Sequence, residues 1–169
     1  MHFIERAVKD MIDKYGTNDP YEICKAMGTQ ILFMDMHPSL KGVYHSFEGT
    51  KYLYINSVFS EYERFYTCLH ELAHTILHEN YNYKFILNHT FFVLDKYEKE
   101  VEYFVACYLI ADVYRILQYK DLTLNEIAYN LNVPKEYVEL RLEYFKSKDC
   151  CLGFENKFFT NLYQPLLCY

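Results

Sequence analysis

The 169-residue sequence contains no tryptophan and only 5 glycines and 4 prolines. So few glycines and prolines argue against long flexible linkers and low-complexity segments. The N-terminal residues 1–16 also lack an uninterrupted apolar core, because charged side chains recur throughout the stretch MHFIERAVKDMIDKYG. This segment therefore resembles neither a signal peptide nor a membrane anchor, and we expect a cytoplasmic protein.

The six cysteines form no CxxC pair and show no regular spacing. Without a secretion signal, this pattern predicts reduced thiols with a structural role.

Positive charge is also in the minority, since the chain has 17 Lys and Arg residues but 23 Asp and Glu residues, which gives a net charge of -6. An extended electrostatic interaction with nucleic acid is therefore disfavoured.

Apolar residues, by contrast, make up 51% of the chain, and 19 tyrosines and 13 phenylalanines make it rich in aromatic side chains. A chain of this length and composition can bury one substantial core, so we predict one domain with a small appendage. The period of the apolar pattern changes along the chain from helical to strand-like and back. This change predicts an α+β fold with a small three-stranded β-sheet.

Helical spacing of apolar residues predicts three longer helices, over residues 3–15, 61–78 and 95–117, the last of them buried. Asp19 followed by Pro20 is typical of a helix start, and Gly28 should end this second helix. Short aromatic and β-branched runs within residues 30–57 predict the three strands, with a hairpin turn at FEGTK. Residues 80–94 fit a loop, a strand pair or part of each.

The C-terminal third predicts a helical pair. TLNE at residues 123–126 fits a capping box, in which Thr123 caps the helix and Glu126 reaches back. Asn132-Val133-Pro134 should break this helix, and a second helix should run to about Lys146. The apolar tail that follows is expected to pack on the rest of the protein.

The stretch TCLHELAHTILH places His70, Glu71 and His74 within the predicted helix 61–78. Residues four apart lie on one face of a helix, so both imidazoles can point at one zinc ion, which binds nitrogen at about 2.0–2.1 Å. Glu71 follows the first histidine, where its carboxylate can take a proton from water at the metal and pass it to a leaving amine. The spacing therefore predicts one zinc ion per chain and Glu71 as the catalytic base.

The motif HExxH also arises by chance in roughly two or three percent of chains with this composition. Its position on an amphipathic helix argues against chance, because buried polar side chains without a ligand would cost about 1–3 kcal/mol each. A catalytic zinc site needs a third protein ligand. The candidates are His78, His89, Asp95, Glu98, Glu100 and Glu102. Helical spacing does not choose among the three glutamates, because apolar residues surround all of them.

The stretches FYTCLHELAHTILH and YEKEVEYFVACYLIA together resemble the ImmA/IrrE family of metallopeptidases. In that family the first helix supplies two histidine ligands and the catalytic glutamate, which correspond to His70, His74 and Glu71. The second helix supplies the third ligand, which corresponds to Glu98. A shifted register would place Glu102 there instead.

The resemblance covers about residues 17–145 and implies a zincin-like helical core. It implies a zinc metallopeptidase domain over residues 1–117 and a C-terminal helical region over residues 118–169 packed on that core. The implied activity is that of a zinc-dependent endopeptidase from a phage or mobile element. Its expected substrate is a helix-turn-helix transcriptional repressor, whose cleavage relieves repression.

The alternative is a non-proteolytic anti-repressor, which would bind the repressor and use zinc only as a structural ion. Intact catalytic residues are compatible with both functions. The predicted helix that follows Pro134 offers no basic recognition face, because its glutamates balance its lysines and arginine. We therefore expect a protein partner, without membrane association and without direct DNA binding.

Overall fold

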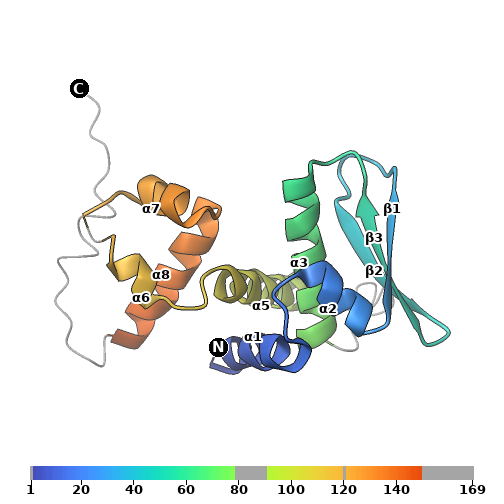
Figure 1. Ribbon diagram of the computed structural model, residues 1–169, viewed down its shortest axis with the longest axis horizontal. Coiled ribbons are helices and arrows are strands. Elements are labelled where there is room, and N and C mark those ends of the chain that lie inside the picture. The colour runs from blue at the N-terminus through green and yellow to red at the C-terminus, as the bar shows by residue number, and fades with distance from the viewer. Residues whose placement is uncertain (1, 79–90, 120, 150–169) are drawn as a thin grey trace. The chain divides into compact units, whose positions relative to one another are not determined.

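A computed structural model describes residues 2–78, 91–119 and 121–149 (Figure 1). The α+β fold predicted from the sequence is confirmed. The chain divides into two compact units, Met1–Val105 and Ala106–Tyr169. The functional division predicted after residue 117 stays a prediction. His89 and the apolar C-terminal tail lie outside the described residues.

The first unit combines helices with a three-stranded sheet (Figure 1). Its elements are α1 (His2–Tyr15), α2 (Pro20–Ala26), β1 (Thr29–Met34), β2 (Gly42–Phe47), β3 (Thr50–Asn56), α3 (Glu61–Leu77) and the part of α5 (Phe91–Leu109) up to Val105. Local signals set several of these bounds. The Asp19 side chain accepts the Tyr21 N–H at the start of α2, as the sequence predicted. Glu48 and Gly49 both have positive φ in the β2–β3 hairpin, which suits the twist of the flanking strands.

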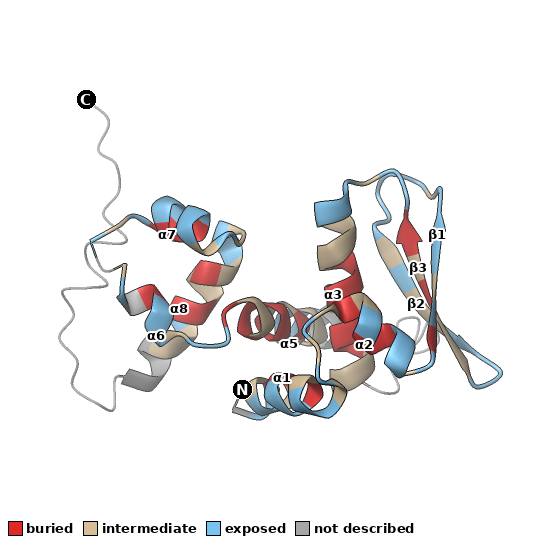
Figure 2. Cartoon of the chain, viewed as in Figure 1, coloured by how far each residue is buried: buried red, intermediate tan, exposed pale blue. Residues whose placement is uncertain are grey.

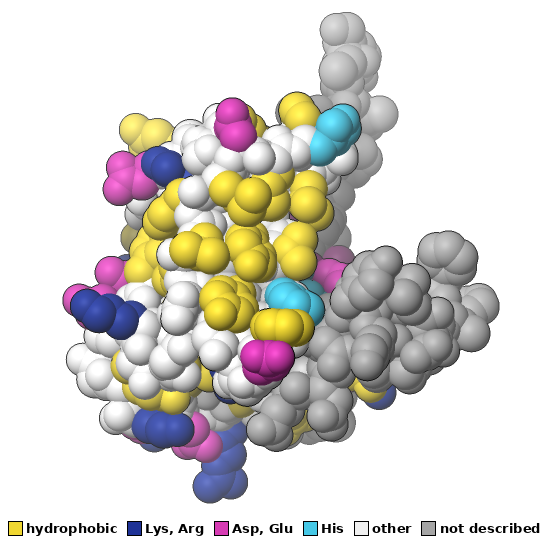
Figure 3. Space-filling model, turned by 90° about the vertical axis from the view of Figure 1, so that its right-hand side faces the viewer, with side chains coloured by type: hydrophobic (Ala, Val, Ile, Leu, Met, Phe, Trp, Pro, Cys, Tyr) yellow, Lys and Arg dark blue, Asp and Glu magenta, His cyan; other side chains and the backbone are white. Residues whose placement is uncertain are grey.

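The strand order is β1-β3-β2, with β1 parallel and β2 antiparallel to β3. Helices α2 and α3 pack on one face of this sheet, where Leu53 and Ile55 of β3 are fully buried (Figure 2). The opposite face carries apolar side chains that stay exposed, and they gather in one area of the surface (Figure 3). These exposed residues are Leu32, Met34, Val43 and Phe47.

The second unit is helical and has its own core. After the end of α5 it contains α6 (Tyr114–Leu117), α7 (Leu124–Leu131) and α8 (Lys135–Asp149). Its buried apolar residues are Ile110, Ile116, Leu124, Ile127, Ala128, Val138 and Leu142. The predicted capping box is present, since the Thr123 and Glu126 side chains each bond the other residue's backbone N–H.

The predicted continuous helix over 95–117 is wrong in its bounds. Helix α5 begins at Phe91 and ends at Leu109, and α6 is a separate short helix. Asp112 lies between them, and its side chain accepts the Tyr114 N–H at 2.9 Å, which competes with continued helical bonding. The apolar pattern does not reveal this break, because Ile110 and Ile116 on either side belong to the same core.

Three observations bear on partners, two of them on DNA and one on membranes. Arg141 of α8 is only 3% exposed and donates to Cys107 Sγ at 3.2 Å, so its charge is turned into the second unit. Lys135 at the start of α8 pairs with Glu139 at 3.1 Å. Among the described helices, none is both long and apolar enough to cross a membrane.

Candidate metal centre

Helix α3 carries the HELAH motif and is anchored at both its start and its buried side. Ser60 and Glu63 form a capping box at its first turn. The residues interleaved with the motif, Cys68, Leu69, Leu72 and Ala73, are all fully buried. His70 and His74 follow each other by one turn, so both imidazoles lie on one side of this fixed helix.

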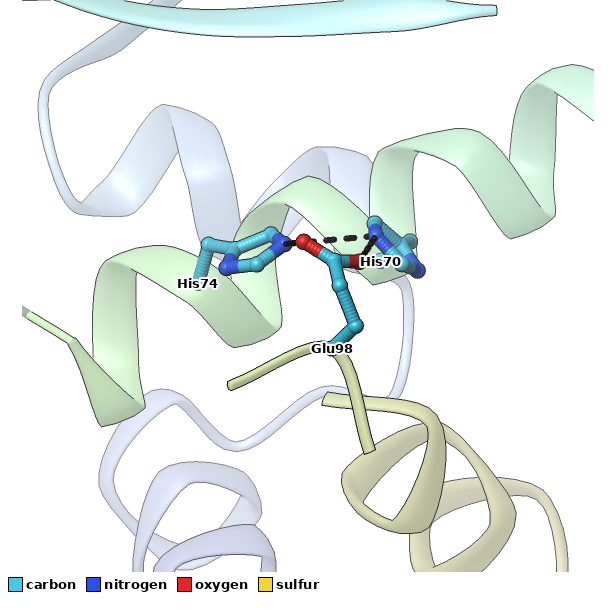
Figure 4. Close-up of side chains that lie close together, drawn as sticks. All are labelled: His70, His74 and Glu98. Atoms are coloured by element: carbon cyan, nitrogen blue, oxygen red, sulfur yellow. Dashed lines mark hydrogen bonds and ion pairs between the residues drawn. The ribbon is translucent and has the colours of Figure 1, made fainter. Parts of the chain in front are cut away.

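Glu98 of α5 reaches the two imidazoles from the facing helix (Figure 4). Its Oε2 lies 3.3 Å from His70 Nε2, and its Oε1 lies 3.4 Å from His74 Nε2. The two Nε2 atoms lie 3.3 Å from each other. The three side chains therefore converge on one point, although they come from segments more than twenty residues apart in the sequence.

The 3.3 Å between the two Nε2 atoms fits two ligands of a tetrahedral metal ion. Glu98 lies within 3.4 Å of both nitrogens, through a different carboxylate oxygen for each. With bonds of about 2.0–2.1 Å, tetrahedral coordination separates neighbouring ligand atoms by about 3.3–3.4 Å. Two imidazole nitrogens and one carboxylate are also the donor set of many catalytic zinc sites, which keep the fourth position for water or substrate. His74 is nearly buried, while 44% of the Glu98 side chain remains exposed, so the site opens on the Glu98 side.

Glu102 contacts the other nitrogen of the first histidine. Its Oε1 lies 3.1 Å from His70 Nδ1, while His70 Nε2 faces Glu98. Glu98 and Glu102 are four residues apart on α5 and so share one face of that helix. A carboxylate on Nδ1 fixes the ring orientation and makes Nε2 the nitrogen available to a metal.

His78, at the C-terminal cap of α3, is directed elsewhere. Its Nε2 lies 2.9 Å from Glu100 Oε2, and its ring packs edge-on against Tyr97 with centroids 4.3 Å apart. His78 and Glu100 are thus paired with each other beside the three convergent residues. Asp95, another candidate ligand, pairs with Lys99 at 2.7 Å.

The charges around His70 favour a cation. Burial acts to lower the pKa of His70, but hydrogen bonds to Glu102 and Glu98 and the charge of Glu71 outweigh it and raise that pKa to about 10. The carboxylates of Glu71, Glu98 and Glu102 thus lie around the imidazoles of His70 and His74. Such an excess of negative charge is what a divalent ion would neutralise.

Glu71 points from the same helix toward the sheet side of the site. Its Oε2 accepts the backbone N–H of Tyr44 in β2 at 3.1 Å. The pKa of Glu71 is raised, mainly because the carboxylate is buried, while His70, His74 and the Tyr44 N–H act to lower it. A raised carboxylate pKa is common for groups that exchange protons near neutral pH.

Sequence reasoning named His70, Glu71, His74, Glu98 and Glu102, and the structure brings all five together. Which of them bind metal or take part in catalysis stays a prediction. The contact of Tyr44 with Glu71 was not foreseen. No sequence signal marks it, because the donor is a backbone group 27 residues away from the acceptor.

Residues 24–143 match the family model described as the IrrE N-terminal-like domain, a peptidase family. The chain belongs to this family. The relationship to ImmA/IrrE metallopeptidases that the motifs indicated is thereby confirmed. Membership in a metallopeptidase family implies a metal ion, and His70, His74 and Glu98 form a group of suitable side chains.

Two relatives resemble this ImmA/IrrE family chain over most of their length. One is the "Uncharacterized immunity region protein 2" of Bacillus phage phi105, with 36% identity over 140 residues, covering 82% of this chain and 88% of the relative. The other is "Metallopeptidase ImmA" of Bacillus subtilis strain 168, with 26% identity over 161 residues, covering 94% of this chain and 91% of the relative.

Proposed function

We propose that this ImmA/IrrE family member is a zinc-dependent endopeptidase that cleaves a helix-turn-helix transcriptional repressor and so relieves repression. The observation that carries the proposal is the convergence of His70, His74 and Glu98 beside Glu71, with the two imidazole Nε2 atoms at the spacing of tetrahedral ligands. The names of the two relatives, one a metallopeptidase and one from a phage immunity region, support it.

In this proposal His70, His74 and Glu98 hold the metal, and Glu102 orients the His70 ring through Nδ1. Zinc held there would polarise the scissile carbonyl and lower the pKa of a water molecule. The exposed side of Glu98 is the side from which a peptide segment reaches the site.

Glu71 moves the protons. It accepts one from the attacking water and donates it to the leaving amine, which requires a carboxylate whose pKa lies closer to neutral pH than that of a solvated glutamate. Burial supplies this shift. The Tyr44 N–H holds Oε2, which leaves Oε1 to make the reactive contact.

The proposed partner is a protein rather than DNA. The net charge is -6. In α8 four acidic residues balance four basic ones, and the arginine among them is buried, so this helix offers no net positive charge to a phosphate backbone. Because the proposed substrate is a transcriptional repressor, the proposed place of action is the cytoplasm.

Replacing Glu71 by glutamine tests the proposal. Glu71→Gln keeps the size of the side chain and an oxygen that can accept the Tyr44 N–H, but it removes the proton acceptor. We expect metal content and thermal unfolding to stay as in wild type, while cleavage of candidate repressors from the same genome falls by about 10²–10⁴-fold. The measurement is the rate at which full-length repressor disappears, with zinc determined by mass spectrometry on the same sample.

The non-proteolytic alternative makes a different prediction for the same variant. A protein that acts by occupancy would relieve repression in a reporter strain when Glu71 is replaced, and the repressor would remain full length. Full relief by Glu71→Gln with intact repressor would therefore replace the peptidase proposal with the binding one.

A further inference from the structure

Strand β2 approaches α3 very closely at Gly42. A Cβ atom at this position would lie 2.5 Å from Thr67 Cγ2, 3.1 Å from Tyr54 O and 3.5 Å from Glu71 Cγ. Carbon atoms attract best at about 3.5–4.0 Å, so a side chain at position 42 would push strand and helix apart by about 1 Å or more. Glycine is therefore needed here to provide space.

The Tyr44 N–H is an outward-facing group of this strand. Within the described sheet, β2 lies at an edge and pairs only with β3. Lys41 O accepts the Asn56 N–H at 2.8 Å. In an antiparallel pair the backbone N–H and C=O groups of every second residue face the partner strand, so those of Lys41, Val43 and His45 face β3. Those of Gly42 and Tyr44 consequently face away from β3. Glu71 Oε2 occupies the position that a neighbouring strand would take, 3.1 Å from Tyr44 N.

Thr67 provides the helix side of this contact. It lies four residues before Glu71 on α3 and is 7% exposed. Its Oγ1 donates to Glu63 O at 2.9 Å, which holds the rotamer and leaves Cγ2 toward Gly42. The methyl group of Thr67 and the bare Cα of Gly42 therefore set the distance between strand and helix.

We propose that Gly42 and Thr67 are positioning residues for Glu71, because their contact sets the distance at which the Tyr44 N–H can hold the Glu71 carboxylate. The inference rests on the proposed role of Glu71 in proton transfer. A carboxylate that is held through one oxygen presents the other in a defined direction, whereas a released carboxylate rotates and reaches the water less often. The effect should appear in kcat more than in KM.

The test is a steric rescue. Gly42→Ala adds a methyl group that meets Thr67 Cγ2, whereas Thr67→Ser removes that methyl group and keeps the hydroxyl. The double variant Gly42→Ala/Thr67→Ser thus exchanges one methyl for another across the contact. The control is Gly42→Ala/Thr67→Val, which keeps a methyl facing position 42 and removes the hydroxyl instead.

We expect Gly42→Ala to lower kcat for repressor cleavage by about 10–100-fold, the range seen when supporting contacts of a site are lost. KM and zinc content should change by less than about threefold. The serine double variant should regain most of the lost kcat, and the valine double variant should regain none. Equal kcat in Gly42→Ala and wild type, or equal rescue by serine and valine, would overturn the inference.

Amide hydrogen exchange gives a readout that needs no substrate. The Tyr44 N–H should exchange slowly in wild type and in the serine double variant, and at least about tenfold faster in Gly42→Ala and the valine double variant. This measurement separates the two proposals. If wild type cleaves no repressor, the proposed function fails, and the exchange pattern alone decides whether Gly42 and Thr67 control the Tyr44–Glu71 hydrogen bond.

Should Gly42→Ala fail to fold, proline at position 44 removes the donor directly. Proline is tolerated on edge strands where the N–H faces away from the sheet. Tyr44→Ala is the reference, because it loses the same phenol ring and keeps the N–H. A kcat at least about tenfold lower for Tyr44→Pro than for Tyr44→Ala would support the inference, and equal values would refute it.

Discussion

Asn56 fixes the segment that leads into β2, and its replacement should strongly destabilise the first unit. The side chain is fully buried at the end of β3. Its Nδ2 lies 3.1 Å from Met36 O, 3.2 Å from His37 O and 2.9 Å from Leu40 O. Its Oδ1 accepts the N–H groups of Met36 and Val58 at 3.2 and 3.3 Å.

The magnitude follows from counting hydrogen bonds. The amide nitrogen of Asn56 has two hydrogens and three carbonyl neighbours, so two of the carbonyls share one hydrogen. We therefore count these three contacts as two hydrogen bonds. Together with the two accepted bonds this makes four, each contributing about 1 kcal/mol net. Asn56→Ala should therefore lower the free energy of unfolding by about 4 kcal/mol, and the remaining cavity adds to the loss.

Asn56→Asp has nearly the same shape but turns a carboxyl oxygen toward the three carbonyl oxygens. Burial among acceptors should raise the pKa of this carboxyl above the usual value of about 3.9. The folded state then holds the proton more tightly than the unfolded state, so stability should fall as the pH rises above about 4. Wild type has no carboxyl at this position, so its free energy of unfolding should not show this additional fall with rising pH.

The assay is urea unfolding followed by circular dichroism, since the chain has no tryptophan to report fluorescence. Ser57→Ala is a suitable control, because Ser57 is exposed, its hydroxyl makes a long hydrogen bond of 3.3 Å to Asp35, and alanine keeps the backbone bond to Met34 O. The control should stay within about 0.5 kcal/mol of wild type. A loss below about 1 kcal/mol for Asn56→Ala would refute the reasoning, as would a pH-independent Asn56→Asp.

Three further predictions concern the metal. Glu98→Ala should retain much less zinc than wild type after loading and dialysis, where wild type should hold about one per chain; equal retention would exclude Glu98 as a ligand. Glu102→Gln should weaken zinc binding by about 10–100-fold in a chelator competition, because His70 loses its orienting carboxylate. Zinc affinity should also fall as the pH is lowered below about 10, since the proton on His70 must leave before its nitrogen can bind metal. An affinity that stays constant between about pH 6 and about pH 8 would contradict the last prediction.

Local spacing was sufficient for those features that depend only on neighbouring residues. His70 and His74 share one face wherever α3 lies, because four residues make about one helical turn. The caps at Asp19 and Thr123 likewise arise from side chains that bond N–H groups two or three residues later. For this reason the sequence predicted the α+β class, most of the elements and the paired histidines.

Other features depended on packing between distant segments. Glu98 and Glu102 lie on the same face of α5, so their spacing cannot show which one faces His70 Nε2 and which faces Nδ1. The rotation of α5 relative to α3 decides it. The strand order was equally hidden, because the apolar pattern of a strand does not name its neighbours.

The sequence by itself therefore determined the helix that carries HELAH and the kind of chemistry it can support. The tertiary structure alone decided which carboxylate meets the two histidines and which backbone N–H holds Glu71. Helical geometry fixes distances within a few residues of chain, whereas distances between α3, α5 and β2 are fixed only by the side chains that fill the space between them.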